Sequence, residues 1–137
     1  GFPSESERDH QDTLSLMEEV KYDFGYMFAY SERPGTYAAR HFEDDISPEI
    51  KQRRLEEIIT LQQRHSLERN KRFLNKECSV LIDKSSKKSN EFWSGRTSEN
   101  NVVVFPKYDF SLGDLVNVKV KDCTTATLIG DINKVKV

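Results

Sequence analysis

The segment Val116-Asn117-Val118-Lys119-Val120-Lys121 has the clearest structural pattern in the sequence. Valine alternates with a polar or basic residue along its whole length, which is typical of a β-strand with one buried face. We therefore predict a strand over residues 116–121, in which the valines face a core and Lys119 and Lys121 face outward.

The same pattern recurs in the second half of the chain. Residues 78–83 alternate in the same way, with Cys78 on the inner face, and residues 102–105 and 127–129 form shorter candidate strands. Four or five short strands separated by turns, without a helical pattern between them, are typical of a small barrel. We predict a small antiparallel five-stranded β-barrel of the OB-like type in residues 74–137.

Two helices are predicted ahead of this barrel. Ser47-Pro48-Glu49 is a favourable helix start, because serine caps the first turn and proline fits the first helical position. No proline or glycine interrupts the following residues as far as Phe73, so we predict a long linker helix over residues 47–73. Residues 9–21 carry apolar side chains at three-residue spacing and predict a second helix.

Residues 24–30, Phe-Gly-Tyr-Met-Phe-Ala-Tyr, form a nearly continuous aromatic and apolar run. Such a run is typical of a strand covered on both faces, as in a parallel sheet. A lone strand cannot pair its own backbone groups, so we interpret residues 1–46 as part of an α/β layer and the chain as a piece of a larger protein. The predicted fold class of the whole is α+β, and we expect the uncovered strand to cause self-association.

Composition limits the classes of protein that the chain can represent. Hydrophobic residues make up 36% of the 137 residues, charged residues make up 32%, and the mean hydropathy is −0.71. No apolar run approaches the ~18 residues of a transmembrane helix, and the polar N-terminus is unlike a signal peptide. We predict a cytoplasmic protein without membrane contact. The two cysteines lie outside any CxxC motif and fit a reducing compartment.

Charge divides unevenly between the two halves of the chain. Residues 1–70 hold 15 acidic and 9 basic side chains, a net charge of 9 − 15 = −6, whereas residues 71–137 hold 8 acidic and 12 basic ones, a net charge of 12 − 8 = +4. The basic half places Lys84, Lys87, Lys88 and Arg96 around Phe92 and Trp93, and it adds Lys119 and Lys121 on the outward face of a strand. Cations beside aromatic rings on a small barrel are typical of single-stranded nucleic-acid binding. An ordinary solvated surface, with Trp93 as a plug closing the barrel end, is the alternative.

No complete catalytic constellation is present in the sequence. His10, His41 and His65 stand alone and are interpreted as surface or structural residues, and no Walker loop or glycine-rich dinucleotide turn occurs. Glu43-Asp44-Asp45 is interpreted as a solvated loop, with magnesium contact as an open alternative. The residues by themselves predict no catalytic chemistry and no metal site in this chain.

Three blocks of sequence resemble one known family. Ser86-Lys87-Lys88, followed after six residues by Gly95-Arg96-Thr97-x-x-Asn100-x-Val102-Val103-x-Phe105, resembles the TRAM domain of MiaB-type tRNA methylthiotransferases. Gly1-Phe2-Pro3-x-Glu5 and Tyr30-Ser31-x-Arg33-Pro34-Gly35-Thr36 resemble the closing part of the radical-SAM barrel in the same family. Ser4 and Glu32 depart from the glycine and proline that the family usually has at these two loop positions.

The resemblance implies a function for the full-length protein. Members of this radical-SAM family bind two [4Fe-4S] clusters and S-adenosyl-L-methionine, and they methylthiolate N6-isopentenyladenosine next to the tRNA anticodon. Their cluster cysteines lie upstream of the matching residues, so the resemblance implies an inactive C-terminal fragment that binds no cofactor itself. The implied domains are a radical-SAM barrel remnant in residues 1–46, a linker helix in residues 47–73 and a TRAM barrel in residues 74–137.

The resemblance also implies site residues. Loops at strand ends face the active site in such barrels, so the S-adenosylmethionine site would be bordered by Gly1, Phe2, Pro3 and Glu5. A loop near the cofactor or substrate would be formed by Arg33, Pro34, Gly35 and Thr36. RNA contacts, with the tRNA anticodon stem-loop as partner, are implied for Lys87, Lys88, Trp93, Arg96, Thr97 and Asn100.

Two alternatives to this function stay open. The chain could be a stand-alone RNA-binding module, although half of an α/β layer has no use in such a module. A sister methylthiotransferase, acting on a ribosomal protein or on another modified tRNA adenosine, is the second alternative. The stretch from Gly95 to Phe105 resembles the tRNA type more than the ribosomal-protein type.

Overall fold

The computed structural model describes residues 1–132. The chain divides into two compact units, Gly1–His65 and a second unit that begins at Ser66. None of the helices in residues 1–132 combines the length and the apolar character that a membrane crossing needs. The last residues of the predicted barrel domain, 133–137, lie outside the described part of the chain.

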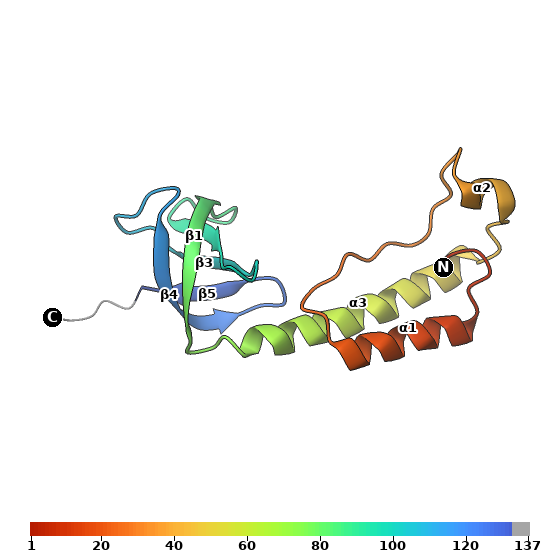
Figure 1. Cartoon of the computed structure of the whole chain (residues 1–137), viewed down its shortest axis with the longest axis horizontal. Helices are drawn as coiled ribbons and strands as arrows, with labels where there is room; N and C mark the ends of the chain where they lie inside the picture. The colour runs from red at the N-terminus through yellow and green to blue at the C-terminus, as the bar shows by residue number, and fades with distance from the viewer. Residues whose placement is uncertain (133–137) are drawn as a thin grey trace. The chain divides into compact units, whose positions relative to one another are not determined.

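The second unit contains a closed β-barrel (Figure 1). Its strands are β1 (Glu77–Ser85), β2 (Phe92–Arg96), β3 (Val102–Pro106), β4 (Leu115–Cys123) and β5 (Leu128–Asp131). Neighbouring strands follow the order β1-β2-β3-β5-β4, and β4 pairs with β1 to close the barrel. The predicted five-stranded barrel is therefore confirmed.

The barrel core follows the alternation read from the sequence. Val116, Val118 and Val120 are buried, while Lys119 and Lys121 lie on the outer face of β4. The other core side chains come from every remaining strand except β2; they are Val80, Ile82, Val103, Phe105 and Leu128. Apolar burial of this kind is the main favourable contribution to folding.

Two details of the barrel differ from the prediction. The strand β2 was not predicted, because its sequence Phe-Trp-Ser-Gly-Arg has no apolar alternation. Its interior position is occupied by Gly95, where a Cβ would lie 2.4 Å from the carbonyl oxygen of Leu81. The expectation of a purely antiparallel barrel is wrong, since β3 and β5 run parallel and pair Val103 with Leu128. Strand directions cannot alternate all the way around a closed ring of five strands, so one pair must be parallel.

The first unit is helical. Helix α1 (Glu7–Val20) begins with a capping box, in which the Asp9 amide donates to Ser6 Oγ at 3.1 Å and the Ser6 amide donates to Asp9 Oδ2 at 2.8 Å. Helix α2 (Tyr37–His41) is one short turn, and α3 (Pro48–Lys71) begins after Ser47. The predicted helices over residues 9–21 and 47–73 are confirmed to within two residues at each end.

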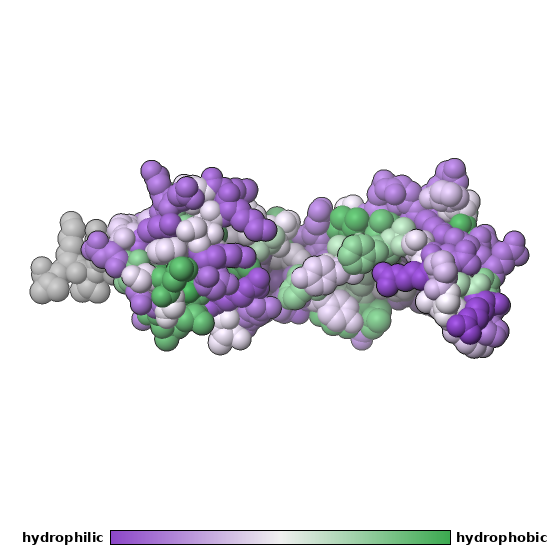
Figure 2. Space-filling view, turned by 90° about the horizontal axis from the view of Figure 1, so that it is seen from above, coloured by the Kyte–Doolittle hydropathy of each residue, from purple (hydrophilic) through white to green (hydrophobic). Residues whose placement is uncertain are grey.

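The strand predicted over residues 24–30 is wrong. This segment is irregular, and the side chains of Phe24, Tyr26 and Phe28 are 58%, 84% and 84% exposed. A strand needs a neighbour to pair its backbone groups, and residues 1–65 contain no strand that could serve. Hydrophobic and intermediate side chains are accordingly visible on the surface of the helical unit (Figure 2).

Candidate nucleic-acid interface on the barrel

A groove of about 460 Å³ lies on the outer face of the barrel. On β2, Trp93 pairs with Phe105 and Gly95 pairs with Val103, so both face the barrel interior. Successive side chains of a strand point to opposite faces, so Phe92 and Ser94 face outward. Pairing sets Ser94 beside Val104, and the parallel β5 sets Ile129 beside Val104 on the other side. Phe92, Ser94, Val104 and Ile129 all line the groove, whose floor is apolar apart from the serine hydroxyl.

Three lysines stand at the rim of this groove. Lys84 belongs to β1, and Lys87 and Lys88 belong to the loop that joins β1 to β2. None of the three has a carboxylate partner within residues 1–132, and no acidic residue is among those that line the groove. Thr124 and Thr127, between β4 and β5, also line the groove. The groove is therefore apolar at its floor and positively charged at its edge.

The loop between β1 and β2 is held by its serines. The Lys88 amide donates to Ser86 Oγ at 3.4 Å, the Glu91 amide donates to Ser89 Oγ at 3.2 Å, and the Ser86 amide donates to the Phe92 carbonyl oxygen at 2.8 Å. These bonds use the serine hydroxyls to satisfy the turn and leave the lysine side chains in solvent.

Trp93 lies inside this unit. Its indole Nε1–H donates to the Phe110 carbonyl oxygen at 3.2 Å, and its ring packs against the barrel core. The ammonium group of Lys107 covers the ring and donates to Ser85 Oγ at 2.8 Å. Of the two roles weighed for Trp93, these contacts support the plug, whereas Phe92 is the aromatic side chain in the groove.

Arg96, Thr97 and Asn100 lie in and beside the loop that joins β2 to β3, outside the groove. Arg96 Nη1 donates to the carbonyl oxygen of Asn100 at 3.3 Å and to its Oδ1 at 2.9 Å, and Arg96 Nε lies 3.9 Å from a carboxylate oxygen of Asp83. Asn100 has a φ of +67°, a left-handed conformation that asparagine tolerates better than most residues. Thr97 Oγ1 accepts from the Asn101 amide at 3.2 Å. Arg96 is 45% exposed and keeps part of its guanidinium in solvent.

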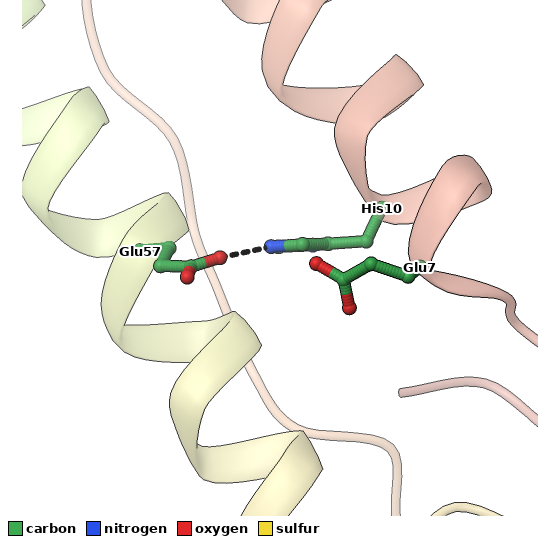
Figure 3. A group of neighbouring side chains, drawn as sticks. All are labelled: Glu7, His10 and Glu57. Carbon is green, nitrogen blue, oxygen red and sulfur yellow. Dashed lines mark hydrogen bonds and ion pairs between the residues drawn. The ribbon is translucent and has the colours of Figure 1, made fainter.

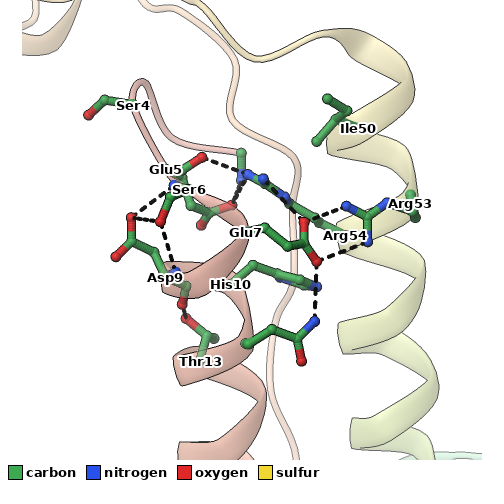
Figure 4. A network of polar contacts seen from close by, with 12 residues as sticks. Ser4, Glu5, Ser6, Glu7, Asp9, His10, Thr13, Ile50, Arg53 and Arg54 are labelled. Carbon is green, nitrogen blue, oxygen red and sulfur yellow. Dashed lines mark hydrogen bonds and ion pairs between the residues drawn. The ribbon is translucent and has the colours of Figure 1, made fainter.

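The residues predicted at a cofactor site form the N-terminal loop of the helical unit. Gly1 and Pro3 belong to this loop, and Pro3 is buried. Phe2 packs against Tyr30 with ring centres 5.2 Å apart. Arg54 Nη1 donates to Glu5 Oε1 at 2.9 Å (Figure 4). Partial burial raises the pKa of Glu5, but the amino terminus and Arg54 outweigh it and hold that pKa below its ordinary value.

The second predicted loop, Arg33-Pro34-Gly35-Thr36, turns the chain into α2. Thr36 Oγ1 donates to the Arg33 carbonyl oxygen at 2.8 Å and accepts from the Ala39 amide, so it caps the helix. Gly35 has a φ of +86° and accepts a bond from Arg40 Nη2 at 2.8 Å. The loop is exposed along its length, which leaves its polar groups accessible.

Sequence reasoning missed a polar network between α1 and α3. The buried His10 Nε2 lies 2.5 Å from Glu57 Oε2, and Glu7 stands beside them (Figure 3). Arg53 and Arg54 both pair with Glu7, Arg53 at 2.6 Å (Figure 4). Arg53 also lies 3.1 Å from a carboxylate oxygen of Glu57. The hydrogen bond from His10 lowers the pKa of Glu57.

This network includes the one group within residues 1–132 whose side chains could supply three metal ligands. Two guanidinium groups already neutralise its two carboxylates, so we assign it a structural role. His65 is buried against Glu18 at 3.1 Å in the same way, while His41 is exposed and stacks on Tyr37. The interpretation of the histidines as structural or surface residues stays a prediction, and His10 does not stand alone, because it pairs with Glu57.

The acidic loop before α3 is also tied to its neighbours. Lys51 Nζ lies 2.7 Å from Asp44, and Asp45 Oδ1 accepts from the Ser4 amide at 2.7 Å. Glu43 is exposed. All three acids are exposed in a loop, as the sequence predicted, and the two aspartates in addition each make a contact within the helical unit.

The cysteines do not fit an iron–sulfur cluster. Cys78 lies on β1 and Cys123 ends β4, and both are free and half-buried. A [4Fe-4S] cluster needs three or four cysteine thiolates, and the chain has two cysteines. Burial also raises the pKa of the Cys78 thiol, which disfavours the thiolate that a cluster needs.

Known proteins are similar to this chain both in the barrel and in the helical unit. Residues 71–133 match the TRAM domain family, so the barrel is a TRAM domain. Nearly the whole chain, 96%, aligns with proteins named tRNA-2-methylthio-N(6)-dimethylallyladenosine synthase: it is 61% identical to that of Christiangramia forsetii, 57% to that of Flavobacterium psychrophilum and 52% to that of Porphyromonas gingivalis. The chain belongs to this methylthiotransferase family, and it spans 27–28% of the length of these relatives.

Proposed function

We propose that this chain supplies tRNA binding to an enzyme that methylthiolates N6-isopentenyladenosine beside the anticodon. The observation that carries the proposal is the lysine-rimmed groove on a TRAM barrel, in a chain 61% identical to a protein named for that reaction. Lysine side chains attract phosphate, and apolar surface accepts bases. In OB-type barrels the second and third strands, with the loops after strands 1 and 4, bind oligonucleotides.

The proposal gives separate roles to the residues around the groove. Lys87 and Lys88 neutralise phosphates, and Arg96 contacts a further phosphate while Asn100 and Thr97 shape the loop that carries it. Trp93 supports the barrel wall behind Phe92. The partner is the anticodon stem-loop, because the target adenosine lies next to the anticodon.

The helical unit would contribute to the catalytic part of the whole enzyme. We propose that the loop of Gly1, Phe2, Pro3 and Glu5 borders the S-adenosylmethionine site, and that the exposed loop over residues 33–36 lies near cofactor or substrate. The clusters and S-adenosylmethionine would supply the radical chemistry in the whole enzyme, which we place in the cytoplasm. This chain would contribute tRNA binding and the loops that border the active site.

A salt titration tests the RNA-binding role. The chain is mixed with a fluorescent anticodon stem-loop at several salt concentrations, and the affinity is plotted against salt on logarithmic axes. A slope of about −0.7 to −0.9 per neutralised phosphate counts the contacts. We expect the double variant Lys87→Gln/Lys88→Gln to bind the stem-loop more weakly. Its affinity should also depend less steeply on salt, by the amount expected for about two phosphate contacts.

The matched control removes the same charge elsewhere on the barrel. Lys119→Gln/Lys121→Gln changes two lysines on the outer face of β4 that do not line the groove. Equal losses from both double variants would contradict a localised site. Absence of binding at low salt would contradict the proposal and favour recognition by other parts of the enzyme or a protein substrate.

A further inference from the structure

One side chain on the groove floor lacks a hydrogen-bond partner. Ser94 is 6% exposed and lies between Lys84 and Val104 in the strand register. Within residues 1–132 its hydroxyl makes no hydrogen bond. The hydroxyl is not among the buried polar atoms that lack a partner, so it is accessible from the groove and available to a group from outside the protein.

The surroundings of Ser94 define the chemistry of that group. Phe92, Val104 and Ile129 form an apolar floor that suits a flat ring. Lys84 and Lys88, which have no carboxylate partner within residues 1–132, line the same groove, where an anion would lie. A volume of about 460 Å³ falls in the ~300–1,000 Å³ range of small-ligand sites. A planar ring with a polar edge and an attached phosphate meets all three conditions.

We propose that the groove binds one unstacked base of single-stranded RNA. The face of the base packs on Phe92 and the apolar floor, its edge exchanges a hydrogen bond with Ser94 Oγ, and Lys84 and Lys88 hold the neighbouring phosphates. This inference rests on the proposed RNA binding and adds the site and the strand state. A base inside a duplex is stacked and paired, so it cannot reach such a floor.

Ser94→Ala tests the proposal directly. The affinity of the whole chain for a labelled single-stranded oligonucleotide and for a duplex of the same sequence is measured by fluorescence anisotropy. We expect tighter binding of the single strand, and a loss of about 2- to 10-fold in that affinity in the variant, the worth of one hydrogen bond. The thermal midpoint should stay unchanged or rise, whereas a merely structural role for the hydroxyl would lower it.

A second variant and a control separate the possible outcomes. Phe92→Leu keeps an apolar side chain but removes the ring, and should weaken single-strand binding at least about 5-fold. Leu115→Ala, which truncates an exposed side chain outside the groove, should bind as the wild type does. Wild-type affinity in both groove variants, or equal binding of duplex and single strand, would overturn the base site while leaving RNA binding intact. Absence of any RNA binding by the wild type would overturn the proposed function as well.

Discussion

The ammonium nitrogen of Lys107 lies 4.1 Å from the centre of the Trp93 ring. The same nitrogen donates to Ser85 Oγ, so one side chain joins the end of β1, the ring on β2 and the segment after β3. A cation over an indole face is among the more favourable cation–π arrangements. This contact holds Trp93 against the barrel and places Phe92, the next residue toward the loop, in the groove.

Removal of the Lys107 charge should weaken the barrel. We expect Lys107→Met to lower the free energy of unfolding by about 1 kcal/mol, because it keeps the apolar stem but loses the cation–π contact and a hydrogen bond. Trp93 is the only tryptophan of the chain, so its fluorescence during urea unfolding reports on the barrel alone. Lys87→Met, an exposed lysine in the loop, is the control and should leave the midpoint unchanged.

Arg96 and Asn100 can be separated by their effects on RNA binding. Arg96→Ala should weaken binding of the anticodon stem-loop and reduce the salt slope by about 0.7–0.9, the share of one phosphate. Asn100→Gly keeps the charge and allows the positive φ, so it should retain the slope. An unchanged affinity of Arg96→Ala at low salt would remove Arg96 from the interface.

Two glycines of the barrel wall should not tolerate a methyl group. A Cβ at Gly95 would lie 2.4 Å from the Leu81 carbonyl oxygen, and one at Gly130 would lie 2.5 Å from that of Lys119. We expect Gly95→Ala and Gly130→Ala each to destabilise the barrel by about 3 kcal/mol, the upper part of the range for overpacking. Thermal unfolding followed by Trp93 fluorescence measures this, with the exposed Ser98→Ala as a neutral reference. A midpoint like that of the reference would show that the backbone relaxes freely.

Acid should destabilise the helical unit through Glu7. The hydrogen bond from Arg53 lowers the pKa of Glu7 from 4.5 to about 2. A group whose pKa is lower in the folded state stabilises that state above its unfolded pKa, and the contribution disappears as the pH falls from 4.5 towards 2. We expect Glu7→Gln to lose stability less steeply than the wild type across this range, in thermal melts followed by far-UV circular dichroism. Glu19→Gln, at the other end of α1, should keep the wild-type slope.

The exposed aromatic segment should promote association of this chain with itself. Tyr26 and Phe28 are each 84% exposed, and large exposed apolar patches mark interaction sites. We expect sedimentation velocity to show association that increases with protein concentration, and Tyr26→Ser/Phe28→Ser to reduce it. A monomer at every concentration in the wild type would contradict this expectation.

The sequence by itself determined the strands that have one buried face. Alternating valines in β4 and the alternation in β1 depend only on residues two positions apart, so a local pattern was sufficient. The start of α3 was equally local, because Ser47 and Pro48 act on the first turn alone. Lys87, Lys88 and Phe92 were also recognisable as candidates, since charge and aromaticity are visible without a fold.

Tertiary structure decided what depends on partners far apart in the chain. The parallel pairing of β3 and β5 follows from closing five strands into a ring, and it alone brings Ile129 beside Val104 to complete the groove floor. The pairing of His10 with Glu57, 47 residues apart, needs α1 packed on α3. Residues 24–30 have the composition of a buried strand but no partner strand in residues 1–65, because backbone pairing requires a neighbour that composition cannot supply.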